Sequence, residues 1–202
     1  MESPKLRYLL AQDREIASLD HVPRLLLHSC CGPCSSACLE LLAQHFFVTV
    51  LWYNPNIQPR EEFDKRLFYQ KKIIAELPTP HPVSLLVADY DGETYENAVQ
   101  NLTDEPEGGA RCTVCFDLRL KKTAEIAKAQ GFEYFTTTLT VSPHKNAPLI
   151  NELGEVIARE VGVKFLPSDF KKRSGYLRSL QLSEQYELYR QNYCGCLYSK
   201  KE

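Results

Sequence analysis

The chain has 202 residues, which is enough for one hydrophobic core or a core with a small appendage. Its 24 basic and 26 acidic residues give a net charge of −2, so binding of nucleic acid would need a local basic patch. No apolar run reaches the ~20 residues of a membrane span, and residues 1–24 lack the continuous apolar segment of a secretory signal. We therefore predict a cytoplasmic protein, in which clustered cysteines are ligands or redox centres more often than structural disulfides.

Strands and helices alternate along the chain from residue 24 onward. Residues 1–22 are predicted to be an extension outside the main fold, and residues 23–202 a single domain. Strands are predicted at residues 24–28, 46–53, 84–89, 134–141 and 163–166. Helices are predicted at residues 34–43, 61–77, 95–102, 112–131, 146–162 and 183–193.

This alternation predicts an α/β fold with an open parallel sheet and helices on both faces, similar to the nucleotide-binding cores of the HUP and PP-loop type. In such folds, functional sites lie at the carboxyl ends of the strands. The residues that directly follow predicted strands are Cys30, Cys31, Asn54, Asn56, Ser142 and Asp169. We therefore expect a metal site at this edge of the sheet.

The eight cysteines fall into separated groups, which are Cys30, Cys31, Cys34 and Cys38, then Cys112 and Cys115, then Cys194 and Cys196. Two thiolates from each of the first two groups would suit tetrahedral zinc or an iron–sulfur cluster. The adjacency of Cys30 and Cys31 and the surplus of thiols favour iron–sulfur, with structural zinc as the alternative.

Cys194-Gly195-Cys196 has the spacing of a strained, easily reduced disulfide, which favours a redox pair. Two more metal ligands, or two small buried residues, remain the alternatives. Cys34 is predicted to be a further site thiol or a ligand of a second metal, and Cys38 a core residue. Asp169 is a candidate acid or metal ligand, or else a turn residue.

Seven ordered motifs between residues 24 and 199 resemble the epoxyqueuosine reductases of the QueH type. They are LHSCCGPC at 27–34, YNPNI at 53–57, RCTVCFDLRL at 111–120, FTTTL at 135–139, SPHKN at 142–146, SDFKK at 168–172 and YRQNYCGC at 189–196. The resemblance implies reduction of the epoxide of epoxyqueuosine to the alkene at the wobble position of tRNA, without cobalamin.

The resemblance also implies a 4Fe–4S cluster, carried onto Cys30, Cys31, Cys112 and Cys115. It further implies an additional mononuclear metal, expected to be iron and placed near Cys34 and Asp169. A redox-active pair is implied at Cys194 and Cys196. Removing an epoxide oxygen as water takes two electrons, so either this dithiol or the second metal would supplement a one-electron cluster. The electron donor is not identified by the sequence.

The sequence offers candidate contacts for the tRNA partner. Bases of an anticodon loop can stack on aromatic side chains, and Tyr53, Tyr176 and Tyr193 are candidates, with core packing equally open. The basic groups at 171–178 and at Arg119, Lys121 and Lys122 could meet phosphates or be solvated surface.

Three other functions compete with the reductase. A nucleotide-binding tRNA thiolation or adenylation enzyme is disfavoured, because Pro33 removes an amide from the loop that would hold phosphate. A non-catalytic zinc protein that binds tRNA would hold a different metal. A thiol–disulfide oxidoreductase would need no cluster.

Overall fold

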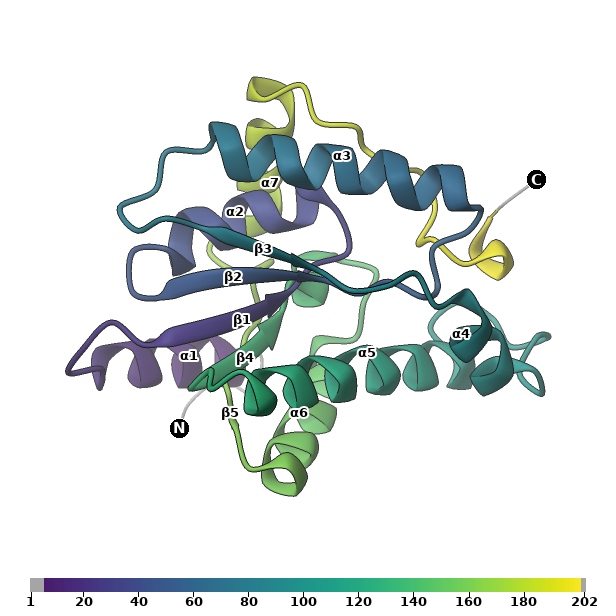
Figure 1. Ribbon diagram of the computed structural model, residues 1–202, viewed down its shortest axis with the longest axis horizontal. Helices are drawn as coiled ribbons and strands as arrows, with labels where there is room; N and C mark the ends of the chain where they lie inside the picture. Colours follow the sequence, from purple (N-terminus) through teal and green to yellow (C-terminus); the bar gives the residue numbers. More distant parts are fainter. Residues whose placement is uncertain (1–5, 201–202) are drawn as a thin grey trace.

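The computed structural model describes residues 6–200 and confirms the α/β class. The five strands are β1 (Arg24–His28), β2 (Phe47–Trp52), β3 (Ser84–Val87), β4 (Tyr134–Thr137) and β5 (Lys164–Phe165). They form one parallel sheet in the order β3-β2-β1-β4-β5 (Figure 1). The helices are α1 (Arg7–Ala17), α2 (Gly32–Leu42), α3 (Arg60–Glu76), α4 (Gly92–Val99), α5 (Ala110–Ala129), α6 (Ala147–Val161) and α7 (Gly175–Gln185).

The central strand β1 is buried on both faces, since Leu25, Leu26 and Leu27 have no exposed surface. Leu25 and Leu27 join the core beneath α2, α3 and α7, whereas Leu26 joins the core beneath α5 and α6. Figure 1 shows these two groups of helices on opposite faces of the sheet. The alternation of side chains along one strand therefore supplies both cores.

Local capping signals end and begin several elements where the sequence predicts. The Asn146 side chain accepts a hydrogen bond from the backbone N–H of Leu149 at the start of α6. Gly162 ends the same helix in the left-handed region, with φ of 75°. These contacts fix the path of the chain between β4 and β5.

The boundaries of three predicted elements are wrong. The helix predicted at 95–102 is α4, which spans Gly92–Val99. The strand predicted at 134–141 ends at Thr137, whose hydroxyl accepts the N–H of Leu139 and starts the 3₁₀ turn η2 (Thr138–Val141). The last helix was predicted at 183–193, but α7 spans Gly175–Gln185. A Cβ at Gly175 would lie 1.9 Å from the carbonyl oxygen of Phe170, so this glycine starts the helix where the two segments touch.

The division of the chain at residue 23 stays a prediction, although α1 packs against the core. Ile16 and Leu19 contact the cluster beneath α2 and α7. The Tyr134 hydroxyl of β4 donates a hydrogen bond of 2.7 Å to the Glu15 carboxylate. No helix within residues 6–200 is long and apolar enough to cross a membrane.

Candidate active site: two adjoining cavities lined by thiols

The turn between β1 and α2 gathers three thiols. The sulfur atoms of Cys30, Cys31 and Cys34 all lie within 4.8 Å of one another. Cys31 caps α2, because its sulfur accepts the N–H of Cys34 at 3.4 Å. Hydrogen bonds from Cys31 and Cys34 lower the pKa of Cys30, whereas burial raises the pKa of Cys31 to about 12. The trio therefore favours a single thiolate that its neighbours share.

Buried polar contacts hold this turn in place. His28 Nδ1 lies 2.8 Å from the Thr137 hydroxyl, and its Nε2 lies 3.1 Å from the Tyr53 carbonyl oxygen. Burial lowers the pKa of His28 to about 3, so it is a neutral core histidine. Gly32 permits close packing, since a Cβ there would lie 2.6 Å from the Tyr69 carbonyl oxygen of α3.

The first turn of α5 carries the second pair of thiols. The sulfur of Cys112 accepts the N–H of Gly108 at 3.1 Å. Cys115 is buried, and burial raises its pKa to about 12. One turn further along, Arg119 Nε donates to the Cys115 carbonyl oxygen at 3.2 Å. The helix thus presents two thiols and one guanidinium at the same place.

The carboxyl-terminal segment brings the third pair to the site. Arg66 of α3 donates to the carbonyl oxygens of Tyr193 and Cys194 at 3.3 and 3.0 Å. The backbone N–H of Gln58 donates to the Gly195 carbonyl oxygen at 2.9 Å. Gly195 has φ of 137°, which a residue with a side chain rarely adopts. Cys194 and its partner two residues on are free thiols in this structure.

These segments enclose two adjoining cavities. We call the first the thiol cavity, and its lining includes Asn56, Tyr95, Arg119, Cys112, Cys115, Cys194 and Cys196. We call the second, of about 330 Å³, the tyrosine cavity, and its lining includes Cys30, Cys34, Tyr176, Arg190, Gln191 and Tyr193. Glu107, His144, Lys145, Cys194 and Ser199 line both. The tyrosine cavity has the size of a small-molecule site.

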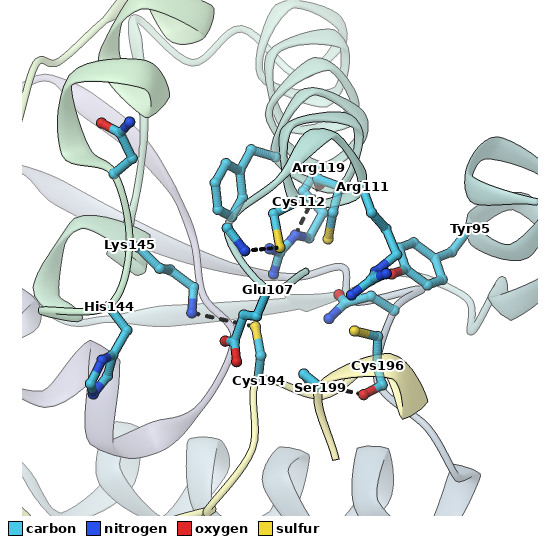
Figure 2. A pocket seen from close by; sticks show the side chains of 15 residues that line it. Tyr95, Glu107, Arg111, Cys112, Arg119, His144, Lys145, Cys194, Cys196 and Ser199 are labelled. Atoms are coloured by element: carbon cyan, nitrogen blue, oxygen red, sulfur yellow. Dashed lines mark hydrogen bonds between the residues drawn. The ribbon is translucent and has the colours of Figure 1, made fainter. Parts of the chain in front are cut away.

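Figure 2 shows the thiol cavity with α5 on one side and the carboxyl-terminal segment on the other. The Lys145 ammonium points at Cys194, and its Nζ lies 3.4 Å from that sulfur. On the neighbouring side, Gln191 Nε2 donates to the sulfur of Cys31 at 3.1 Å. Side-chain nitrogen donors therefore reach thiols in two of the three groups.

The four cysteines predicted to hold the cluster do not all lie in one compact group. Among residues 6–200, the one group of three metal-binding side chains within 4.8 Å is Cys30, Cys31 and Cys34. Cys112 and Cys115 lie in the neighbouring thiol cavity and are not part of that trio. Their shared role in holding a cluster stays a prediction. The predicted core position of Cys38 is confirmed, since it has no exposed surface.

Asp169 does not join the thiols. It lines a separate cavity with Leu9 and Gln12, and it forms an ion pair with Lys171 at 2.9 Å. It is absent from the linings of both the thiol cavity and the tyrosine cavity.

The predicted basic patches differ in the structure. Arg119 is only 1% exposed, so the surface patch predicted around it is wrong. Arg173 and Arg178 form ion pairs with Asp13 and Glu40, which leaves less free charge at residues 171–178 than the sequence suggests.

Four residues near the thiols had no predicted role in the site. They are Arg66, Arg119, Lys145 and Gln191. Arg119, Lys145 and Gln191 lie within the motifs at 111–120, 142–146 and 189–196, and these motifs were the only sequence signal that pointed to them. The candidate stacking residues divide, because Tyr176 and Tyr193 line the tyrosine cavity whereas Tyr53 is only 4% exposed and belongs to the core.

The donor set fits a thiolate-bound metal centre. Seven of the eight cysteines line one of the two cavities or touch a thiol that does, and sulfur ligands suit zinc and iron–sulfur clusters. Burial raises the pKa of Cys112 and of Cys115, so a metal would displace protons from thiols there. The cationic side chains that line the thiol cavity would offset the resulting negative charge, and they are Arg111, Arg119 and Lys145.

Comparison with known proteins agrees with the geometry. A family model described as epoxyqueuosine reductase QueH matches residues 25–202. A protein of that description from Streptococcus pyogenes serotype M1 is 46% identical over 181 residues, which cover 89% of this chain and 71% of the relative. One from Thermotoga maritima is 36% identical over 184 residues, which cover 88% and 91%. The chain therefore belongs to the QueH family.

Proposed function

We propose that the protein is an epoxyqueuosine reductase that converts epoxyqueuosine in tRNA to queuosine. The observation that carries the proposal is the meeting of three cysteine groups beside a cavity large enough for a modified base. Family membership supports the same reaction. A tRNA and an electron donor are the partners, and we place the protein in the cytoplasm with them.

We further propose that Cys30, Cys31, Cys112 and Cys115 hold a 4Fe–4S cluster, without cobalamin. Cys34, which lies within 4.8 Å of two of these sulfurs, is the candidate ligand of an additional iron. When bound, these groups supply single electrons and Lewis acidity. The proposal does not use Asp169, because that carboxylate lines a different cavity.

The chain's own residues would bind the base and shield it from water. Tyr176 and Tyr193 line the tyrosine cavity, where they can stack on a base turned out of the anticodon loop. Arg190 lines the same cavity, and its guanidinium can meet a phosphate. Cys194 lines both cavities, so its thiol faces the place where the cyclopentane ring would enter.

The overall reaction balances with the carboxyl-terminal dithiol as reductant. Cys194 and Cys196 lose two electrons and two protons as they form a disulfide. The epoxide takes up both, its two C–O bonds break, the alkene forms and the oxygen leaves as water. An external donor then returns the disulfide to the dithiol. Lys145 Nζ, 3.4 Å from the Cys194 sulfur, can hold a proton at this place.

The first test is metal analysis of protein purified without oxygen. We expect acid-labile sulfide and about five irons per chain, which are four in the cluster and one additional iron. After reduction with dithionite, we expect a cluster signal in EPR. The same preparation should convert epoxyqueuosine to queuosine in an anticodon stem-loop, measured by mass spectrometry. Cys194→Ser should stop multiple turnover, and sustained turnover by that variant would exclude the dithiol from the cycle.

A zinc protein that binds tRNA is the second candidate. The compact trio of Cys30, Cys31 and Cys34 favours it, since three close thiols and one further ligand make a zinc site. One zinc per chain and no sulfide in the anaerobic preparation would select this function over the reductase.

A further inference from the structure

Three cationic side chains line the thiol cavity. Arg111 donates to the backbone carbonyl oxygens of Leu102, Thr103 and Glu105. The other two come from different elements. Arg119 comes from the third turn of α5, and Lys145 from the segment before α6 (Figure 2). Arg119 is 1% exposed, and its Nη2 atom has no hydrogen-bond partner. Lys145 is partly buried, and its Nζ contacts the sulfur of Cys194. The Lys145 ammonium thus contacts a sulfur, and the Arg119 guanidinium lines the same cavity as the thiols.

Neither cation is neutralised by a carboxylate. Within the part of the chain that the structure describes, neither Arg119 nor Lys145 forms an ion pair with Asp or Glu. Glu107 lines the same cavities, but it too forms no ion pair there. The Arg66 guanidinium offers a contrast, because Glu62 accepts from it at 2.6 Å. A buried cation without a partner is costly, so a negative charge is expected in the cavity.

The groups that face the two cations are thiols. Burial alone would lower the pKa of Arg119, but the thiolate charges of Cys115, Cys194 and Cys30 outweigh it and raise that pKa. Burial likewise opposes the charge of Lys145, and thiolates at Cys194, Cys30 and Cys34 raise its pKa. Negative charge on these sulfur atoms therefore stabilises both cations, which line the same cavity as Cys112, Cys115 and Cys194.

The amount of charge also matches. An oxidised 4Fe–4S cluster held by four thiolates carries a net charge of about −2, and reduction by one electron makes it about −3. In the lining of the thiol cavity, the charges of Arg111 and Glu107 offset each other. The Arg119 guanidinium and the Lys145 ammonium would then balance the oxidised form. Because the charge of the reduced form is larger, the same cations stabilise it more strongly.

We propose that Arg119 and Lys145 are positioning residues that balance the charge of the iron–sulfur cluster and raise its reduction potential. This inference rests on the proposed function, because it needs a cluster on the thiols. It adds that two side chains outside the ligand set decide how easily the cluster accepts an electron. The two act by charge at close range, not by binding iron.

The test is an EPR-monitored redox titration of anaerobically purified protein that holds its cluster. Arg119→Gln and Lys145→Gln should each lower the ratio of reduced to oxidised cluster at least tenfold at a fixed potential, which is a shift of about −59 mV for one electron. Arg119→Lys and Lys145→Arg keep the charge and should stay near the unsubstituted protein. Lys122→Gln is the matched control, because it removes an exposed charge from the same helix and should change nothing.

The outcomes separate the inference from the proposed function. A cluster present in every variant with an unchanged potential overturns the inference and leaves the function standing. An unsubstituted protein that holds zinc and no sulfide overturns both. The Gln variants could lose the cluster, which is measured as iron and sulfide per chain. In that case, the test is whether the charge-keeping variants retain the cluster. Retention in Arg119→Lys and Lys145→Arg supports charge balance, and loss in these variants as well overturns it.

Discussion

Replacement of Arg66 by methionine should loosen the carboxyl-terminal segment from the rest of the protein. Arg66 is 1% exposed, pairs with Glu62 at 2.6 Å and donates to the carbonyl oxygens of Tyr193 and Cys194. Removing one partner of a buried ion pair costs about 3–5 kcal/mol. The Glu62 carboxylate is 11% exposed and keeps the hydroxyl of Tyr189 at 3.2 Å, so we expect the lower end, a loss of about 3 kcal/mol.

The measurement combines urea unfolding with hydrogen exchange at a single reporter. The N–H of Gln58 bonds to the Gly195 carbonyl oxygen, so release of the segment exposes that amide. Arg66→Met should lower the free energy of unfolding and speed exchange at Gln58. The double variant Glu62→Gln/Arg66→Met lacks the unpaired carboxylate and should regain part of the stability. A loss below about 1 kcal/mol with unchanged exchange at Gln58 would refute the anchoring role.

Three further predictions follow from single contacts. Gly195→Ala puts a side chain at a backbone φ of 137°, so we expect a strain of about 1–3 kcal/mol and slower multiple turnover. Unchanged turnover would contradict the need for glycine at this position. Gly154→Ala places a Cβ 2.5 Å from the ring of Phe165, which should cost about 1–3 kcal/mol in thermal unfolding; a stabilised variant would show that α6 shifts freely. The protonated His21 ring donates hydrogen bonds to the carboxylates of Asp20 and Glu133, which raise the pKa of His21 above 6.5. The contribution of His21 to stability is therefore full below pH 6.5 and is lost as the pH rises through the folded pKa. NMR titration of His21 should show that raised value and its fall in Asp20→Asn, and an ordinary pKa would contradict the contact.

Much of the site could be predicted because short sequence motifs contain its reactive residues. Apolar runs followed by Cys30 or Asn54 fix where strands end, and the ends of neighbouring parallel strands share one edge of the sheet. The predicted burial of Cys38 is confirmed. Asp169 also follows a strand, yet it turns to a different cavity, because strand position does not decide side-chain direction.

The sequence by itself determined the α/β class, the family and the thiols available for chemistry, since hydrophobic periodicity and motif spacing are local properties of the chain. Only the tertiary structure decided which charges serve those thiols. Arg119 looks like a surface residue beside Lys121 and Lys122, and helix packing alone buries it in the thiol cavity. Lys145 reaches Cys194 across 49 positions of sequence. Burial and long-range contact depend on how elements pack, and no local pattern encodes them.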